Sequence, residues 1–321
     1  MFETPGNLPT WNQRIGILTG LLFLVCVAHS QISSKAKIRG KYFGQNPPGM
    51  NAVLFAKGIV STDSIEHSAP AFSPDGRIVL WTKIYQGRPA FLVEMRMKKN
   101  GIWTQPSLPS FASGDADDFY PSFSVDGKKL FFSSRRPMPA GYPKNEDMWI
   151  WVVESTKSGW KSPKPVDTTV IKGFEYGHSV SKNGTIFFSS RRDGTFDIFS
   201  ASSVKHKYQP PQLLKDSINT SGYEDGPFIA PDESYLIFES QRPESIEGSI
   251  DLFICFKKKD GSWSKPKNMG PKINSKYSER FASVSPDGKY LFFGSNRRQH
   301  TDNLYFDIYW ISAKIIGELR H

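Results

Sequence analysis

An acidic or imidazole side chain precedes each of five similar segments of this sequence. These residues are His67, Asp118, Glu175, Glu224 and Glu279. If the five segments surround a common axis, four carboxylates and one imidazole gather at one opening. Three interpretations follow: the carboxylates bind backbone N–H groups or arginines structurally, the ring holds a cation or a basic ligand group, or two carboxylates act as acid and base in glycosidic chemistry.

Arginine and aspartate occupy two further repeated positions. The arginines are Arg136, Arg192, Arg242 and Arg297, and the aspartates are Asp147, Asp197, Asp251 and Asp307. The first segment has Ile84 and Ala90 there, so both partners are missing together. This joint loss predicts that each arginine pairs structurally with the aspartate of its own repeat, in the order given. Three less regular arginines are candidate ligand contacts: Arg135, Arg191 and Arg298.

The spacing of the repeated turns indicates the fold. The turns are centred on Asp75, Asp126, Asn183, Asp232 and Asp287, at spacings of 51, 57, 49 and 55 residues. A repeat of about 40 to 50 residues with strand patterning is typical of a β-propeller with four-stranded blades. In a propeller the first strand of each blade lines the central axis, which would place the acidic residues around the mouth of a channel.

Each repeat contains four candidate strands. The first alternates in polarity, and the second is almost continuously apolar, as in IVLW, LFFS, IFFS, LIFE and LFFG. Such a stretch suits burial between neighbouring blades. A third apolar strand follows. The fourth is marked by an aromatic residue three positions before a proline, which suits an outer edge strand. These pairs are Trp103 and Pro106, Trp160 and Pro163, Tyr208 and Pro211, and Trp263 and Pro266.

The last repeat has no fourth strand before the chain ends. A strand-like segment without a repeat of its own, NAVLFAK, lies at residues 51–57. Pairing of this segment with the blade formed by residues 279–313 would close the ring and remove the exposed edges of an open array. We therefore predict an all-β protein: a five-bladed propeller of four-stranded antiparallel blades over residues 51–321, closed by its N-terminal strand.

The N-terminal segment differs from the repeats. Arg14 precedes the apolar run IGILTGLLFLVCVA, and polar sequence begins at Gln31. This pattern predicts a cleaved signal peptide at residues 1–30, followed by a lead-in at residues 31–50. The alternatives are a membrane anchor, for which the run is shorter than the roughly 20 residues needed, and a lipoprotein through Cys26. We expect a periplasmic or secreted protein without a stable membrane span.

Charge and cysteine content limit the classes of partner. The net charge of +10 suits an acidic partner such as a polyanionic glycan, or it reflects lysines that keep loops soluble. Nucleic acid is not expected as a partner, because no binding motif is recognisable. Only Cys255 would remain after cleavage, so we expect a buried thiol and no intramolecular disulfide. No resident cofactor or metal is expected apart from a candidate cation at the channel mouth, and we expect a monomer.

The repeat unit SPDGKYLFFGSNR, with SPDGRIVLW, SVDGKKLFFSSRR and SKNGTIFFSSRR, resembles the WD40-like propeller repeats of the TolB family. The resemblance covers most of residues 66–313. It implies an exported propeller that works by binding another macromolecule. This chain differs in lacking the N-terminal α/β domain of TolB and in having five copies where six are usual. Related propellers precede serine peptidase domains, but no G-x-S-x-G motif is present here.

These observations favour a non-catalytic binding or scaffold protein that recognises an envelope protein or a glycan through its channel face. The alternative is a carbohydrate-active enzyme of the glycosidase type. Its catalytic pair would come from Asp118, Glu175, Glu224 and Glu279.

Overall fold

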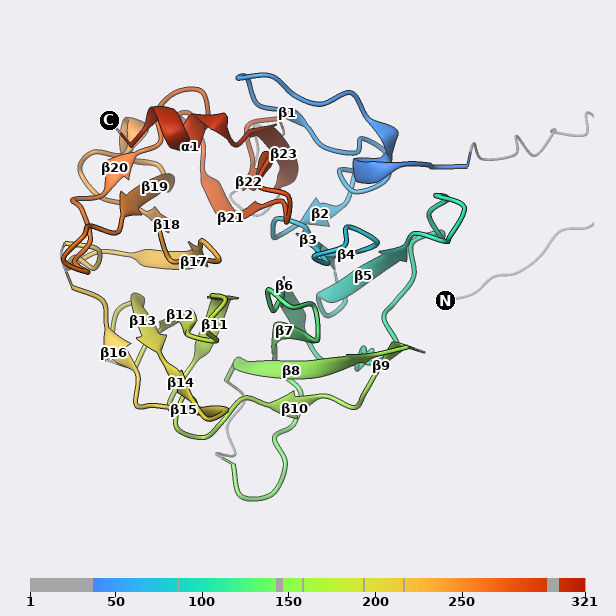
Figure 1. Ribbon diagram of the computed structural model, residues 1–321, viewed down its shortest axis with the longest axis horizontal. Coiled ribbons are helices and arrows are strands. Elements are labelled where there is room, and N and C mark those ends of the chain that lie inside the picture. Colours follow the sequence, from blue (N-terminus) through green and yellow to red (C-terminus); the bar gives the residue numbers. More distant parts are fainter. Residues whose placement is uncertain are drawn as a thin grey trace, which may run out of the picture. The chain divides into compact units, whose positions relative to one another are not determined.

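The computed structural model describes residues 37–320, apart from residues 86, 143–146, 158, 193, 216 and 299–305. The predicted signal peptide lies outside the described residues. Within the described part, five antiparallel sheets surround a common centre, as Figure 1 shows. The predicted all-β, five-bladed propeller is confirmed.

The first two blades hold the strands between residues 65 and 165. Blade 1 contains β2 (Ile65–Glu66), β3 (Ala71–Phe72), β4 (Ile78–Ile84) and β5 (Phe91–Arg96). Blade 2 contains β6 (Asp118–Phe123), β7 (Lys129–Ser134), β8 (Trp149–Thr156), β9 (Gly159–Trp160) and β10 (Lys164–Pro165). The first strand of blade 1 is interrupted between β2 and β3, whereas β6 is continuous.

Blades 3 to 5 complete the ring. Blade 3 contains β11 (Glu175–Val180), β12 (Ile186–Ser190), β13 (Asp197–Ala201) and β16 (Gln212–Leu213), beside a small hairpin of β14 (Ser203–Val204) and β15 (Lys207–Tyr208). Blade 4 contains β17 (Glu224–Ile229), β18 (Tyr235–Ser240), β19 (Asp251–Phe256) and β20 (Lys267–Asn268). Blade 5 contains β21 (Glu279–Val284), β22 (Tyr290–Ser295) and β23 (Asp307–Ser312).

The N-terminal strand closes the ring. Strand β1 (Val53–Leu54) pairs antiparallel with β23, and Val53 lies opposite Trp310. Phe55 continues the ladder, since its N–H donates to the carbonyl of Ile308 at 2.8 Å. This confirms the predicted closure by residues 51–57. Short helical elements complete the described chain: η1 (Lys41–Gly44), η2 (Ile246–Gly248) and α1 (Lys314–Glu318).

The second strands lie between blades, as their continuous apolar sequence predicts. Phe292 of β22 packs in a cluster with blade 1 residues, whereas its neighbours Leu291 and Phe293 pack in a cluster with blade 4 residues. Alternate side chains of one strand therefore bury against both neighbouring blades, because successive residues of a strand point to opposite faces. Five such apolar clusters lie at the five blade interfaces.

The outermost strand of a blade begins directly after the proline that was predicted to mark it. Strands β10, β16 and β20 each begin one residue after such a proline. In blade 1, Ser107 follows Pro106 and forms an isolated bridge with Glu94. Proline thus precedes the outer ladder, because it lacks the N–H that a ladder position donates.

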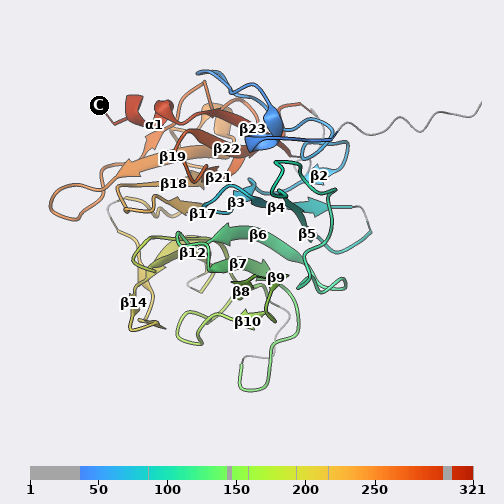
Figure 2. The ribbon, with the colours of Figure 1, turned by 45° about the vertical axis from the view of Figure 1, so that its right-hand side comes forward.

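The innermost strands contain a repeated irregularity. The pairing of β6, β11, β17 and β21 with the next strand shifts by a bulge at the third residue of each strand. The bulged residues have positive φ: Tyr120 (53°), Gly177 (47°), Gly226 (57°) and Phe281 (48°). A bulge re-aims side chains, and the four strands that carry these residues lie around the centre, a region that can also be followed in the turned view of Figure 2.

Candidate functional site

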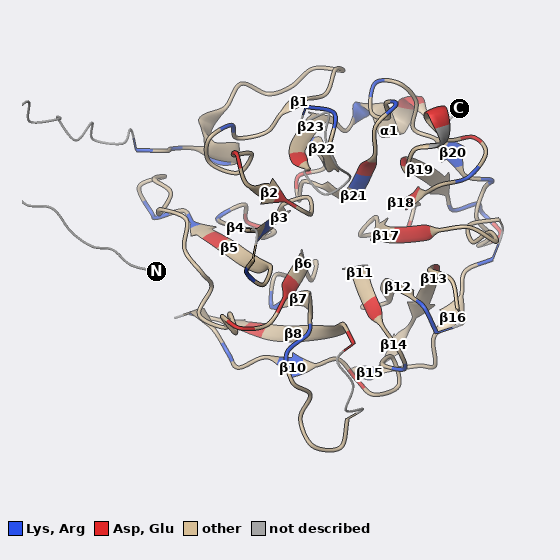
Figure 3. Ribbon diagram, turned by 180° about the vertical axis from the view of Figure 1, so that it is seen from behind, with Lys and Arg blue, Asp and Glu red and all other residues tan. Residues whose placement is uncertain are grey.

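The channel has two ends, which we name by the innermost strands. The start face is the end where these strands begin, at Glu66, Asp118, Glu175, Glu224 and Glu279. The turn face is the end where they reach the turns at Asp75, Asp126, Asn183, Asp232 and Asp287. Figure 3 shows acidic positions on β6, β11, β17 and β21, with a basic position next to the acidic one on β21.

The carboxylates of the start face are buried and form ion pairs. The side chains of Glu175, Glu224 and Glu279 have no exposed surface, and Asp118 is 1% exposed. Each carboxylate accepts from one arginine of its own blade. The Nη2–oxygen distances are 2.8 Å for Arg136–Asp118, 2.8 Å for Arg192–Glu175, 3.2 Å for Arg242–Glu224 and 3.0 Å for Arg297–Glu279.

The predicted pairing of these arginines with Asp147, Asp197, Asp251 and Asp307 is therefore wrong. Asp307 pairs instead with Arg298, whose Nε donates to Oδ2 at 2.7 Å. Asp251 accepts from Asn268 Nδ2 at 2.6 Å.

The reason lies in the loop that enters each blade. Arg192 also donates to the carbonyl of Val170, and Arg242 donates to that of Ile218, both at 2.8 Å. These carbonyls lie in the loops that lead to the innermost strands. The guanidinium consequently turns toward the first strand, where a carboxylate and a carbonyl are both available as acceptors.

Backbone N–H groups also donate hydrogen bonds to these carboxylates. Glu175 Oε1 accepts from the N–H groups of Lys172 and Gly173 at 3.1 and 2.9 Å. Glu279 Oε2 accepts from the N–H of Ser275 at 2.7 Å. Burial raises the pKa of both carboxyls, although the neighbouring arginine opposes the shift. Each carboxylate thus joins the first strand, the second strand and the preceding loop.

His67 is not the equivalent of these carboxylates. Glu66 pairs with Lys83 in the strand ladder, as Glu279 pairs with Ser295. Glu66 also accepts from the hydroxyl of Thr62 at 2.8 Å, in the way Glu279 accepts from Ser275. The first strand of blade 1 has one more residue before its turn. The prediction of His67 as the blade 1 member of this ring is therefore wrong, and Glu66 is the equivalent residue.

The residues one position later meet inside the channel. Arg280 of blade 5 lies among Asp225 and Glu239 of blade 4, and neither carboxylate has exposed surface. Arg280 Nε donates to Glu239 Oε2 at 2.5 Å, and its Nη2 lies 3.5 Å from Asp225 Oδ2. Tyr223 donates to Asp225 Oδ2 at 2.5 Å, and Tyr176 of blade 3 donates to the same oxygen. We call Arg280, Asp225 and Glu239 the central charge cluster.

The central charge cluster holds more acid than base. Burial raises the pKa of Glu239 to about 8, and Arg280 opposes that shift. Glu239 Oε1 has no hydrogen-bond partner among the described residues. If one proton is bound by the two carboxyl groups at neutral pH, one negative charge remains, and it balances the positive charge of Arg280.

Aromatic rings block the channel beside this cluster. The rings of Tyr120 and Phe281 lie 4.5 Å apart between centroids, and Tyr120 lies 5.3 Å from Tyr176. His67 donates to or accepts from the Tyr120 hydroxyl at 2.9 Å. Its position in the channel lowers the pKa of His67 to about 3, through burial and the charge of Arg280. All five blades therefore contribute to one buried layer.

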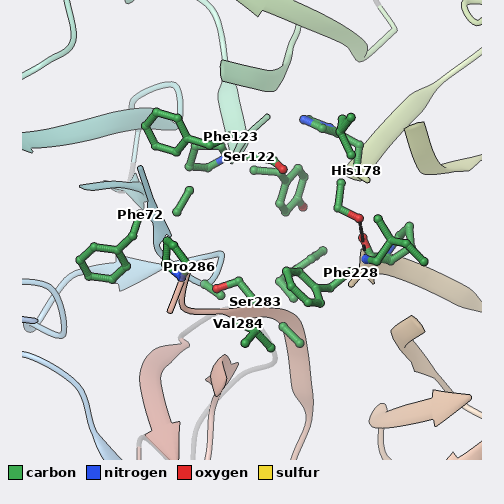
Figure 4. A pocket seen from close by; sticks show the side chains of 18 of the residues that line it. Phe72, Ser122, Phe123, His178, Phe228, Ser283, Val284 and Pro286 are labelled. Atoms are coloured by element: carbon green, nitrogen blue, oxygen red, sulfur yellow. Dashed lines mark hydrogen bonds between the residues drawn. The ribbon is translucent and has the colours of Figure 1, made fainter. Parts of the chain in front are cut away.

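A cavity lies on the other side of this layer, toward the turn face. Its volume is about 240 Å³, and its floor includes Tyr120, Gly177, Gly226 and Phe281. Phe72, Phe123 and Phe228 lie in its walls with Val284 and Pro286, as Figure 4 shows. The lining is mainly apolar, so an uncharged group fits it better than an ion.

His178 is the histidine of this lining. It is 6% exposed, and Nδ1 lies 3.4 Å from Ser133 Oγ. Its Nε2 has no hydrogen-bond partner among the described residues. Burial lowers the pKa of His178 to about 4, so the ring is neutral at pH 7.

The structure brings together two of the three candidate ligand contacts, Arg135 and Arg191. Arg135 and Arg191 lie exposed on the start face, and both guanidiniums lie 5.7 Å from the ring centroid of Phe174. Arg298 is engaged with Asp307. No group of three or more His, Cys, Asp or Glu side chains suited to a metal is found in the described part of the chain.

Two functional candidates were missed in the sequence. Glu239 lies in the apolar second strand LIFES, where other blades have serine, threonine or glycine, and this polar exception was the available signal. His178 lies in the alternating first strand, and nothing in its spacing distinguished it. Cys255 is buried in β19, as predicted.

Comparison with known proteins finds similar solved structures but no matching family model or curated protein. Neither the family models nor the curated proteins match this sequence. A solved structure described as TolB from Agrobacterium tumefaciens is 20% identical, with a TM-score of 0.47, covering 75% of this chain and 73% of that one. TolB from Acinetobacter baumannii is 14% identical, with a TM-score of 0.48, covering 79% and 59%. As expected, TolB structures are thus among those to which the chain is similar.

Peptidase structures contain a similar region. A puromycin hydrolase is 11% identical, with a TM-score of 0.41, and the match covers 71% of this chain but 33% of that one. The chain therefore spans about a third of the length of that enzyme. Within the described residues, no helix is long and apolar enough to cross a membrane.

Proposed function

We propose that this chain is an exported, non-catalytic propeller that binds a partner protein of the cell envelope through its turn face. The observation that carries the proposal is the position of the cavity. It opens toward the turn face, whereas the four candidate catalytic carboxylates lie buried in ion pairs at the start face. A carboxylate that is held by an arginine and by backbone N–H groups is poorly placed to attack or protonate a substrate.

The composition of the cavity favours a protein partner over a glycan. Glycans present hydroxyl groups that need hydrogen bonds, whereas Phe72, Phe123 and Phe228 offer apolar surface. A cavity of about 150 Å³ is known to hold benzene, so a volume of about 240 Å³ accommodates an aromatic or large aliphatic side chain. The partner would insert one such side chain along the axis, and the turns around the opening would contact its backbone.

A pair of variants tests the cavity. Ser122 lines it, so the ring introduced by Ser122→Phe would occupy part of its volume. Ser110→Phe adds the same ring at an exposed position outside the cavity. Peptides selected for binding from a random library should carry an apolar residue essential for affinity. Titration calorimetry should show their binding lost with Ser122→Phe and retained with Ser110→Phe. Equal binding by both variants would contradict the proposal.

A screen for glycan hydrolysis tests the enzymatic alternative. The full chain, Glu175→Gln and Glu224→Gln are incubated with a panel of oligosaccharides, and products are separated by chromatography. We expect no turnover by any of them, with lowered thermal stability in the two variants because each loses an ion pair. Turnover by the natural chain that either change abolishes would establish the glycosidase instead.

A further inference from the structure

We propose that the partner of the turn face presents an acidic surface around the apolar side chain that it inserts. This inference rests on the proposed function, because it names the charge of the partner for that same face. It depends on four outer hairpins, which follow the third strands of blades 1 to 4. They lie at residues 97–102, 155–160, 203–208 and 257–262.

The outer hairpins lie on the turn face. The third strand of a blade ends beside the turn of its own innermost strand, as three hydrogen bonds show. The N–H of Met97 donates to the carbonyl of Arg77 at 2.7 Å, that of Ser155 to Lys128 at 2.8 Å, and that of Lys257 to Ser234 at 3.0 Å. The hairpins follow directly, two to three strand spacings outside the innermost strands, or about 10–14 Å. They therefore form a rim around the opening of the cavity.

This rim contains most of the excess positive charge of the chain. The outer hairpins hold eight lysines and one acidic residue, Asp260, so they carry +7 of the net charge of +10. Three of the hairpins each expose two lysines that form no ion pair with a described residue. These are Lys98 and Lys99, Lys205 and Lys207, and Lys258 and Lys259.

The turns nearest the cavity carry no such excess. They hold five basic and five acidic residues, over residues 73–77, 124–129, 181–185, 230–235 and 285–289. The loops that enter the innermost strands at the start face also hold five of each, over residues 55–64, 108–117, 166–174, 214–223 and 269–278. In the loops that leave the second strands, four arginines are already paired with buried carboxylates. Lysines that served solubility alone would be expected on both faces.

An apolar centre within a charged rim is the usual composition of a protein–protein interface. Here the cavity is the centre, the turns around it are neutral overall, and the outer hairpins are positive. Rim charges steer association and disfavour partners of like charge. A bilayer surface has no projecting side chain for the cavity, so a protein fits the whole face better. Such a partner carries Asp and Glu side chains at a distance from its inserted residue.

Two peptides test this charge pattern against the full chain by titration calorimetry in about 0.15 M salt. Both have six glutamates on either side of one central residue, which is Phe in one peptide and Ser in the other. Six extended residues span about 20 Å, enough to reach the outer hairpins from the cavity. We expect the natural chain to bind both peptides, and the Phe peptide more tightly. Ser122→Phe should remove that difference and leave the Ser peptide bound.

A rim variant combines Lys98→Gln, Lys99→Gln, Lys258→Gln and Lys259→Gln. It removes four exposed charges from the outer hairpins of blades 1 and 4. Both peptides should bind it about tenfold or more weakly, because their glutamates lose the opposite charges on the rim.

A matched variant combines Lys57→Gln, Lys172→Gln, Lys215→Gln and Lys276→Gln. It removes the same charge from exposed positions in loops of the start face. These lysines lie about one strand length, or roughly 20 Å, from the turn face, beyond the Debye length of about 8 Å at this salt. Affinity should therefore change by less than about twofold. Unchanged midpoints of thermal unfolding in both variants show that the fold is intact.

The outcomes separate this inference from the proposed function. Equal binding by the rim and matched variants would exclude the lysine rim, even if the natural chain still prefers the Phe peptide. A Phe peptide that binds no better than the Ser peptide would instead exclude insertion into the cavity. No binding of either peptide by the natural chain at about 1 mM would overturn the inference. Binding only to vesicles with about 30% phosphatidylglycerol, lost in the rim variant, would assign the rim to a membrane surface.

Discussion

Residues of one chemical type have different roles in this propeller, according to their burial. Arg192 lies against a buried carboxylate, Arg191 is exposed with its guanidinium over aromatic rings, and Arg280 lies inside the channel. Sequence spacing placed the first two side by side, but only their surroundings separate a structural ion pair from a candidate ligand contact. The central charge cluster around Arg280 makes the sharpest predictions, because its carboxylates have no solvent to replace a lost partner.

Replacement of Arg280 by methionine should destabilise the fold strongly. Asp225 and Glu239 would then be buried without their cation, and breaking a buried pair in this way costs about 3–5 kcal/mol. The free energy of unfolding in urea measures the change. Arg88→Met, at an exposed position, should shift it by no more than about 0.5 kcal/mol. If both variants unfold at the same urea concentration, the cluster contributes no stability.

The pKa of Glu239 predicts a loss of stability at alkaline pH. In the unfolded chain this carboxyl loses its proton near its ordinary pKa of 4.5, whereas in the fold burial holds the pKa at about 8. The folded state therefore binds more protons between these values, and stability falls as pH rises through that window. Glu66, with a pKa raised to about 7, contributes in the same direction.

Glu239→Gln isolates this contribution. Its free energy of unfolding should fall less than that of the natural chain between about pH 7 and pH 9, since glutamine has no proton to lose. The two histidines of the channel do not interfere there: His67 and His178 have folded pKa values of about 3 and 4, so their effect on stability is complete above their ordinary pKa of 6.5. Parallel pH profiles for the two proteins would show that Glu239 titrates normally.

Among the elements, the bulge of the innermost strands determines which side chains enter the channel. Two blades have aromatic residues at the bulge, Tyr120 and Phe281, and two have Gly177 and Gly226. The rings occupy the space that the glycines leave free. A Cβ at Gly226 would lie 3.0 Å from Phe281 Cδ1 and 2.7 Å from Glu239 Oε1. The blades therefore depend on one another through this position.

Gly226→Ala should destabilise the protein more than Gly288→Ala. Both glycines have positive φ, at 57° and 69°, so alanine costs about 1–2 kcal/mol of backbone strain at either position. No atom lies within 4 Å of a Cβ at Gly288, whereas Gly226 is crowded. Chemical denaturation of the two variants measures the difference. An equal loss would mean that the channel layer can adjust around an added methyl group.

At the scale of the whole molecule, stability depends on the closure of the ring by β1 and β23. The segment that contains β1 contributes Phe55, which is fully buried and lies 4.9 Å from Phe292 and 5.2 Å from Trp310 between ring centroids. The N-terminal segment and strands β22 and β23 thus share one apolar cluster with blade 1. Opening this junction would expose the edge of β23, which invites pairing with another chain.

Phe55→Ala should weaken this closure by about 3–5 kcal/mol, the usual cost of removing a buried phenylalanine side chain. Val53 lies two residues earlier, in β1, but is 44% exposed, so Val53→Ala is the matched control with a small effect. Urea unfolding gives the stabilities, and size-exclusion chromatography with light scattering shows whether Phe55→Ala associates. A loss no greater than that of Val53→Ala would assign closure to the backbone ladder alone.

The sequence by itself determined the number of blades, their strand order and the closure by the N-terminal strand. These features depend on local patterns, namely turn residues, alternation of polar and apolar residues, and apolar runs. Each repeat contains these patterns independently of the others. It also located the acidic residues at the start of the innermost strands, from which four of the five equivalent positions were identified correctly.

Only the tertiary structure decided the partners of the charged residues and the position of the cavity. Arg297 and Asp307 belong to the same blade, yet Arg297 pairs with Glu279 and also donates to the carbonyl of Ile273 in the loop that enters the blade. The blocked start face and the open turn face result from contacts between side chains of different blades. Such contacts join residues far apart in the chain, so they cannot be predicted from the spacing of residues within one repeat.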